Sequence, residues 1–204
     1  MWSSLSDIAQ QLVIGLRQTS ALEFVAVLFG IVSVLFSRKE NILVYPTGLI
    51  NTTLYIYLSA VAGLYAEAGV NLYYSVMSVV GWVRWAKKRE GRPELRITRS
   101  DAREWSTALL FFGACWAVLY GVLATWTDST VPTTDAFASA AAYTGMWLMT
   151  RKKLENWLWW IVTNLAAIPL YFVKGFVFTS FQHLVFLALA ISGYLMWCRR
   201  LQEA

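Results

Sequence analysis

Seven stretches of mainly apolar residues follow one another along this chain, separated by short segments that carry most of its charge. A helix needs about 20 such residues to cross roughly 30 Å of hydrocarbon. The stretch at 135–150 is the shortest and is rich in alanine. The pattern predicts an all-α integral membrane protein with seven transmembrane helices, at 21–37, 42–62, 66–86, 105–126, 135–150, 156–174 and 178–198.

The segment before the first span has a weaker helical pattern. Leu5, Ile8 and Leu12 recur at helical spacing within residues 3–17. This segment forms either an N-terminal amphipathic helix in the membrane interface, which we favour, or an eighth span. No cleavable signal peptide is expected, because the segment lacks a basic start and a long apolar centre.

The composition indicates that lipid is the main solvent of this chain. Hydrophobic residues make up 58% of it and charged residues only 14%, and the mean hydropathy is +0.51. A soluble domain has about one quarter charged residues. The 11 tryptophans fit a membrane protein, since indole rings anchor at bilayer interfaces. Cys115 and Cys198 are expected to be small apolar residues within helices, without a disulfide.

The Lys and Arg residues predict the orientation of the spans. They gather after the first, third, fifth and seventh spans, whereas the opposite loops hold only Lys174. This distribution predicts an outer N-terminus and a cytoplasmic C-terminus. The net charge of +5 does not indicate a nucleic-acid partner, because the basic residues fall between apolar runs.

The two halves of the chain resemble each other at a spacing of about 112–115 residues, with Gly81, Trp82 and Trp85 matching Gly193, Tyr194 and Trp197, and Asn51 matching Asn164. If a unit of three spans were followed directly by its copy, the copy would be inverted in the membrane. A single helix between the two three-helix units restores the orientation of the second unit. We therefore expect a 3+1+3 arrangement of parallel repeats, with substrate near the midplane where the repeats meet. The expected segments are an N-terminal helix at 1–20, a first bundle at 21–86, a basic linker at 87–104, an inverter helix and outer loop at 105–134, and a second bundle at 135–204.

Trp157, Trp160 and Asn164 open the sixth span at positions i, i+3 and i+7, so they share one helix face. Two indoles one turn apart form a slot for a flat ring, and a cationic ring gains further from their π faces. The alternative for Trp157 is an interfacial anchor. Asn51 offers a second amide from the first half, and its alternative role is a hydrogen bond between helices.

The remaining candidate contacts lie on three other spans, as Tyr55, Tyr74, Gln182 and His183. His183 is the only histidine and lacks the companions of a metal site, which leaves a structural contact, a ligand contact or a proton relay. Glu23, Glu67 and Asp135 fall at the outer ends of spans, so none places a carboxylate in mid-membrane. No phosphate-binding loop or nucleophile–base set occurs. The chain is expected to be a passive carrier, neither an enzyme nor dependent on a cofactor.

The order of spans, the segment from Trp157 to Trp160 with Asn164, and the segment from Tyr45 to Asn51 resemble the Pnu family of vitamin transporters, and most closely its PnuC nicotinamide riboside branch. The resemblance implies a SWEET-related fold in the bacterial cytoplasmic membrane, facilitated diffusion of nicotinamide riboside, and trapping by cytoplasmic phosphorylation. It also implies a homotrimer, and Trp157, Trp160, Asn164 and Asn51 as leading ligand contacts. The alternatives are thiamine or riboflavin as the vitamin, or a membrane binding protein that moves nothing.

Overall fold

The structure is a computed structural model that describes residues 10, 13–14, 20–61, 65–89, 91–127, 131–173 and 177–203. Its described part contains seven long helices, in agreement with the seven apolar stretches. The elements are α2 (Ala21–Arg38), α3 (Val44–Val61), α4 (Tyr65–Ala86), β1 (Lys88–Arg89), β2 (Arg92–Pro93), α5 (Ala102–Trp126), α6 (Pro132–Met149), α7 (Asn156–Val173) and α8 (Val177–Glu203). Four helices, α2, α5, α7 and α8, are long and apolar enough to cross a membrane. The helix predicted within residues 3–17 lies almost wholly outside the described residues.

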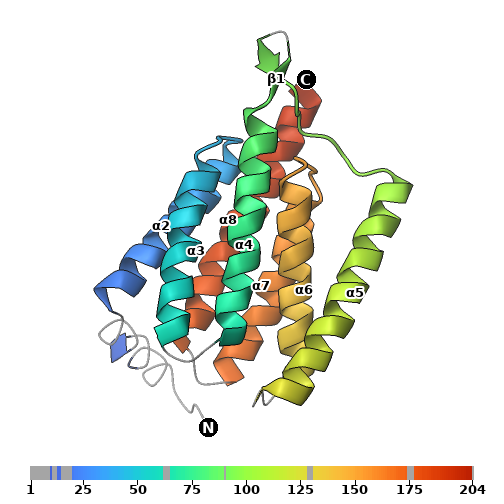
Figure 1. The fold of residues 1–204 in the computed structure, drawn as a ribbon. Coiled ribbons are helices and arrows are strands. Elements are labelled where there is room, and N and C mark those ends of the chain that lie inside the picture. The colour runs from blue at the N-terminus through green and yellow to red at the C-terminus, as the bar shows by residue number, and fades with distance from the viewer. Residues whose placement is uncertain are drawn as a thin grey trace.

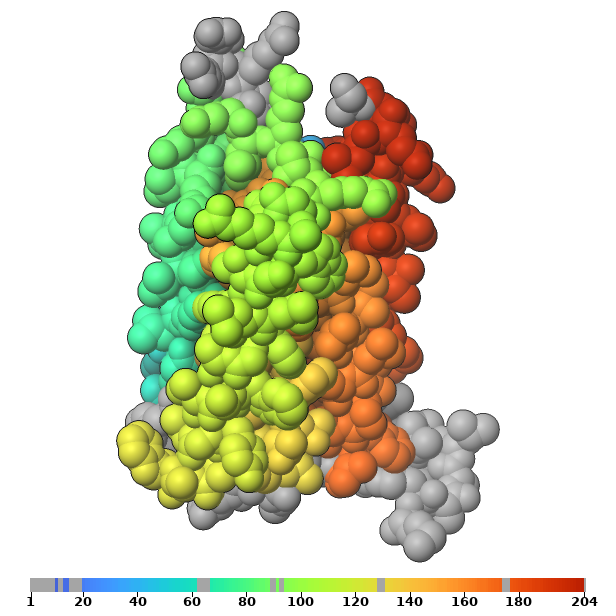
Figure 2. Space-filling view, turned by 90° about the vertical axis from the view of Figure 1, so that its right-hand side faces the viewer, coloured from blue at the N-terminus to red at the C-terminus, as the bar shows by residue number. Residues whose placement is uncertain are grey.

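The helices form one bundle (Figure 1). Helix α3 packs against α2 and α4, and α7 packs against α6 and α8. These two groups of helices meet where α2 contacts α8 and where α4 contacts α6. Helix α5 packs against α6 and covers one outer face of the molecule (Figure 2). Its outward side includes Leu110 and Val118, which are largely exposed, as expected of a surface that faces lipid.

Helix α6 lies in the interior of the bundle because many of its side chains are small. It packs against α4, α5 and α7, and Ala136, Ala140 and Ala141 are fully buried. Small residues let helix backbones approach closely in lipid, where van der Waals packing replaces the hydrophobic effect as the main attraction. Since neighbouring helices shield α6 from lipid, its modest hydropathy is compatible with its central place.

The segment between α4 and α5 is more ordered than the basic linker expected at 87–104. It begins with the antiparallel pair β1–β2 and then runs alongside the α6–α7 loop. The N–H of Thr98 donates to the carbonyl of Lys152 at 3.2 Å. The Glu155 carboxylate accepts hydrogen bonds from the N–H and the hydroxyl of Ser100, at 2.9 and 2.8 Å. The linker is thereby fastened to the second half of the chain, which its charge pattern does not predict.

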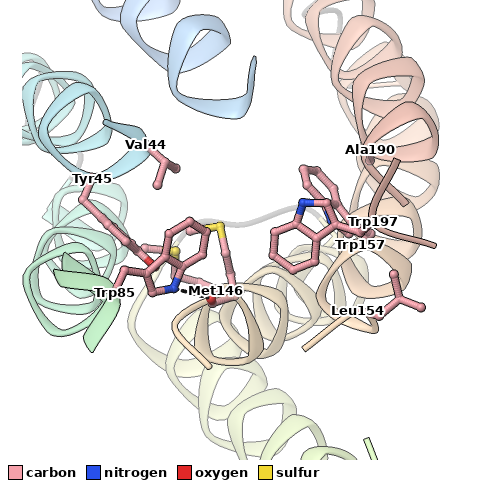
Figure 3. Close-up of a cluster of buried hydrophobic side chains, with 9 residues drawn as sticks. Val44, Tyr45, Trp85, Met146, Leu154, Trp157, Ala190 and Trp197 are labelled. Carbon is pink, nitrogen blue, oxygen red and sulfur yellow. Dashed lines mark hydrogen bonds between the residues drawn. The ribbon is translucent and has the colours of Figure 1, made fainter. Parts of the chain in front are cut away.

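Aromatic side chains form the core at the end of the bundle that carries the α2–α3 and α6–α7 loops, hereafter the basic end (Figure 3). Trp85 meets Tyr45 edge to face, with centroids 5.2 Å apart. Trp197 meets Trp157 in the same way at 5.6 Å. Each pair belongs to one half of the chain, and the two pairs together fill the core at this end of the bundle.

Candidate functional site

A chain of hydrogen bonds runs along α7 and crosses to α8. Asn164 is 4% exposed; its Nδ2 donates to the carbonyl of Trp160 at 2.8 Å, and its Oδ1 lies 2.8 Å from Nδ1 of His183. Because a backbone carbonyl only accepts, the amide nitrogen faces Trp160 and the amide oxygen faces His183. Nδ1 of His183 therefore carries the proton, and Nε2 is the acceptor nitrogen of the neutral ring. The pair holds two predicted contacts in one orientation.

His183 is also held by aromatic rings. It stacks on Tyr171, with centroids 5.2 Å apart and planes inclined by 9°, and its ring lies 6.2 Å from that of Phe186. The side chain of Tyr55 of α3 lies near that of Gln182, the neighbour of His183 in α8, and near Tyr171. The predicted residues Tyr55, Gln182 and His183 therefore lie together, although they come from different halves of the chain.

Trp160 meets a second group of rings, from α4 and α6. Tyr74 lies 6.4 Å from Trp160 and 5.9 Å from Tyr143. Tyr73 stacks on Tyr143 at 4.1 Å, and its hydroxyl donates to the Tyr143 carbonyl at 3.0 Å. The predicted residues Tyr74 and Trp160 thus belong to an aromatic cluster at the contact between the two groups of helices.

Three tyrosines of this site, Tyr73, Tyr143 and Tyr171, were missing from the predicted contacts. Tyr171 follows Asn164 by seven residues, so it lies on the same face of α7, and helical spacing was the signal that would have found it. Tyr143 is the aromatic residue within an alanine-rich stretch of α6. Its partners lie on α4, and nothing in the spacing along α6 points to them.

Trp157 belongs to the core at the basic end, against which Tyr73, Tyr74 and Trp160 also pack (Figure 3). It is 2% exposed, and its ring rests on Gly193 of α8, where a Cβ would come within 2.6 Å of the ring. Tyr45 rests on Gly81 of α4 in the same way. The two indoles of the predicted slot therefore have different surroundings, since Trp160 is partly exposed and borders Asn164.

Asn51 does not meet Asn164. Its Nδ2 donates to the carbonyl of Ala26 at 2.7 Å and joins α3 to α2, which is the helix–helix bond given above as the alternative. At a uniform spacing of 112 residues, Asn164 is matched by Thr52, whose hydroxyl lies 2.7 Å from that of Ser75. Both matched positions therefore bond to the next helix of their own half.

The site offers neutral hydrogen-bonding groups and aromatic faces, a combination suited to a flat polar ring that carries hydroxyl groups. Among the described residues, no group of three His, Cys, Asp or Glu side chains gathers as metal ligands would. The chemistry supported by these contacts is reversible binding.

Comparisons with known proteins place the chain among membrane transporters. A family model described as "Nicotinamide mononucleotide transporter" matches residues 20–199. The chain is 24% identical to the nicotinamide riboside transporter PnuC of Escherichia coli K12, covering 90% of this chain and 87% of the relative. It is 28% identical to the PnuC protein of Neisseria mucosa, over 93% and 76%. It is 22% identical to the riboflavin/roseoflavin transporter RibM of Streptomyces davaonensis, over 87% and 84%. A crystal structure of the vitamin B3 transporter PnuC matches with a TM-score of 0.72 and 25% identity, over 98% of this chain and 90% of the other.

Proposed function

This chain belongs to the nicotinamide mononucleotide transporter family, and we propose on this basis that it is a vitamin B3 transporter that carries nicotinamide riboside. It is a multi-pass membrane protein, like the other members. Two relatives and the solved structure named above support this vitamin. The observation that carries the proposal is the joint presence of a family match over most of the chain and the bonded group Trp160, Asn164 and His183.

The site chemistry favours the riboside over the mononucleotide named in the family description. A phosphate group brings about two negative charges and needs a cationic partner when it leaves water. The Lys and Arg residues of the described part lie in or beside the loops and helix ends of the basic end, and none is bonded to the site. A neutral ribose needs only donors and acceptors, which Asn164, His183 and Gln182 provide.

We assign the six clustered residues to the ligand by their chemistry. The cationic nicotinamide ring lies against the rings of Trp160 and Tyr74, where the π faces favour positive charge. The ribose hydroxyls bond to Asn164, His183 and Gln182, with Tyr55 beside Gln182. Trp157 and Asn51 contribute by fixing α7 on α8 and α3 on α2.

The architecture that accompanies this function is the 3+1+3 arrangement of parallel repeats, with segments at 1–20, 21–86, 87–104, 105–134 and 135–204. Residues 112 apart take matching places, such as Tyr45 on Gly81 and Trp157 on Gly193, and this supports the repeat. The basic end faces the cytoplasm by the positive-inside rule, with an outer N-terminus in the bacterial inner membrane. A homotrimer is the proposed assembly.

Transport is proposed to be facilitated diffusion, with the riboside trapped by phosphorylation in the cytoplasm. A coupled carrier needs an ionisable group that binds the driving ion within the membrane. Glu23, Glu67 and Asp135 lie instead near the helix ends opposite the basic end. The carrier then equilibrates its substrate, and the charged product cannot return.

With the membrane potential held at zero, uptake of this cationic substrate by liposomes that contain the purified protein is expected to follow the nicotinamide riboside gradient alone. Dissipating proton and sodium gradients should leave the initial rate unchanged, because no coupling group is used. Strict dependence on either gradient would contradict facilitated diffusion.

Tryptophan fluorescence with nicotinamide riboside, nicotinamide mononucleotide, thiamine and riboflavin tests the substrate separately. A response to riboflavin alone would move this chain to the group of its 22% identical relative.

A further inference from the structure

Residues that are 112 positions apart touch each other at the basic end. The Ser37 hydroxyl donates to the sulfur of Met149 at 3.4 Å, and Nζ of Lys152 lies 2.7 Å from Oε1 of Glu40. In two units related by a two-fold axis, equivalent residues meet only close to that axis. These contacts therefore mark the place where the axis between the halves leaves the bundle.

The two indoles at this end exchange hydrogen bonds between the halves. Nε1 of Trp85 donates to the carbonyl of Met149, and Nε1 of Trp197 donates to the carbonyl of Ser37, both at 3.2 Å. The two rings lie 6.3 Å apart (Figure 3). Each half thus binds the helix end of the other, and both indole side chains are buried, with Trp85 6% and Trp197 0% exposed.

One charged pair departs from this symmetry. Glu40 and Lys152 occupy matching positions, and both have left-handed backbones, with φ values of 57° and 51°. Their charges are opposite, so they attract where two copies of one residue would repel. Oε2 of Glu40 also accepts from Arg200 at 2.9 Å. The acid therefore comes from the first half, and both of its cationic partners come from the second.

Lys152 is bound to this position more tightly than a surface lysine. Its side chain is 5% exposed, and Nζ also lies 4.6 Å from the centroid of the Trp85 ring. A buried ammonium that loses its partner is strongly unfavourable until water reaches it. The linker holds the Lys152 backbone through Thr98, so this lysine moves with the second half.

We propose that Glu40 and Lys152 form a gate at the basic end, closed in this structure, whose ion pair must separate before substrate can pass. The proposal rests on the proposed transport function. Glu40 acts on access to the site and does not touch the substrate. Separation of the halves breaks the bonds of Glu40 to Lys152 and Arg200 together with the two indole–carbonyl bonds, so the gate opens as one unit.

The gate is tested by the reactivity of a cysteine placed at Ser37, which is 2% exposed, in a chain with Cys115→Ala and Cys198→Ala. Membrane vesicles that expose the basic end are treated with a membrane-impermeant maleimide. Glu40→Gln is expected to raise the labelling rate about tenfold or more, the effect of one lost charge-assisted bond. Glu104→Gln is the matched control. It removes a 2.7 Å ion pair with Lys153 at the same end of the bundle, and this ion pair does not join the two halves.

The charge-reversed set E40K/K152E/R200E decides between a gate and a general loss of structure, since Glu40 pairs with both Lys152 and Arg200. Each single reversal is expected to label rapidly. The triple variant is expected to label more slowly than the single reversals, because the exchanged charges again attract one another between the halves. Rapid labelling of a monodisperse triple variant, or equal rates for Glu40→Gln and Glu104→Gln, would overturn the gate. Labelling needs no substrate, so a failure to carry nicotinamide riboside would count against the proposed function alone.

Discussion

Replacing Asn164 with alanine is expected to weaken binding of nicotinamide riboside by roughly 10- to 100-fold. The change removes an amide proposed to bond the ribose, and it leaves Nδ1–H of His183 without its 2.8 Å acceptor in a buried place. A buried donor without a partner costs about 1–3 kcal/mol, and each 1.4 kcal/mol is about tenfold in Kd. Titration of tryptophan fluorescence with nicotinamide riboside in purified protein measures the change.

Asn51→Ala provides the matched control, since it removes the same amide from the bond to Ala26. We expect it to lower thermal stability while Kd changes less than about threefold. The double variant N164A/H183A should lose more than N164A but less than the sum of the two single losses, because both single variants break the same bond between the two residues. Binding by Asn164→Ala equal to that of the parent would remove this residue from the site, and a larger loss for Asn51→Ala would move the site to α3.

The helices could be predicted because lipid restricts the backbone conformations that a membrane-spanning segment can adopt. A segment in hydrocarbon must satisfy every backbone N–H and C=O within itself, so apolar length almost defines a helix. The stretch expected at 156–174 became α7 at Asn156–Val173. The order within the linker could not be predicted in this way, because Thr98 and Ser100 find their partners in a loop about 50 residues later.

The candidate site was predicted in outline and less well in its details. Helical spacing correctly places Trp157, Trp160 and Asn164 on one face of α7, but it does not say which neighbour covers each of them. Gly193 of α8 makes room for Trp157, and that fact lies on another helix. The pairing of Asn51 with Asn164 assumed a spacing of 113, and one residue turns a helical side chain by about 100°. Because of this difference in direction, the Asn51 amide bonds to α2, whereas the Asn164 amide bonds to α8.

Replacing Gly193 with alanine is expected to destabilise the protein by about 1–3 kcal/mol, the usual cost of overpacking a core. The added Cβ would lie 2.6–2.7 Å from three ring atoms of Trp157. The ring is 2% exposed and meets Trp197 edge to face, so it has little room to retreat. Thermal unfolding in detergent, followed by tryptophan fluorescence, should show a lower midpoint, which gives the relative stability of the variants.

Gly113→Ala is the control, because nothing lies within 4 Å of its Cβ position on α5. Alanine favours a helix over glycine by about 1 kcal/mol in water, so this control also corrects for backbone propensity. Adding Trp157→Phe to Gly193→Ala removes the ring atoms that the new methyl group strikes. The double variant should regain part of the lost stability. The packing of Trp157 on Gly193 does not hold α7 against α8 if Gly193→Ala and Gly113→Ala unfold at the same midpoint temperature. The same conclusion follows if Trp157→Phe restores none of the stability that Gly193→Ala loses.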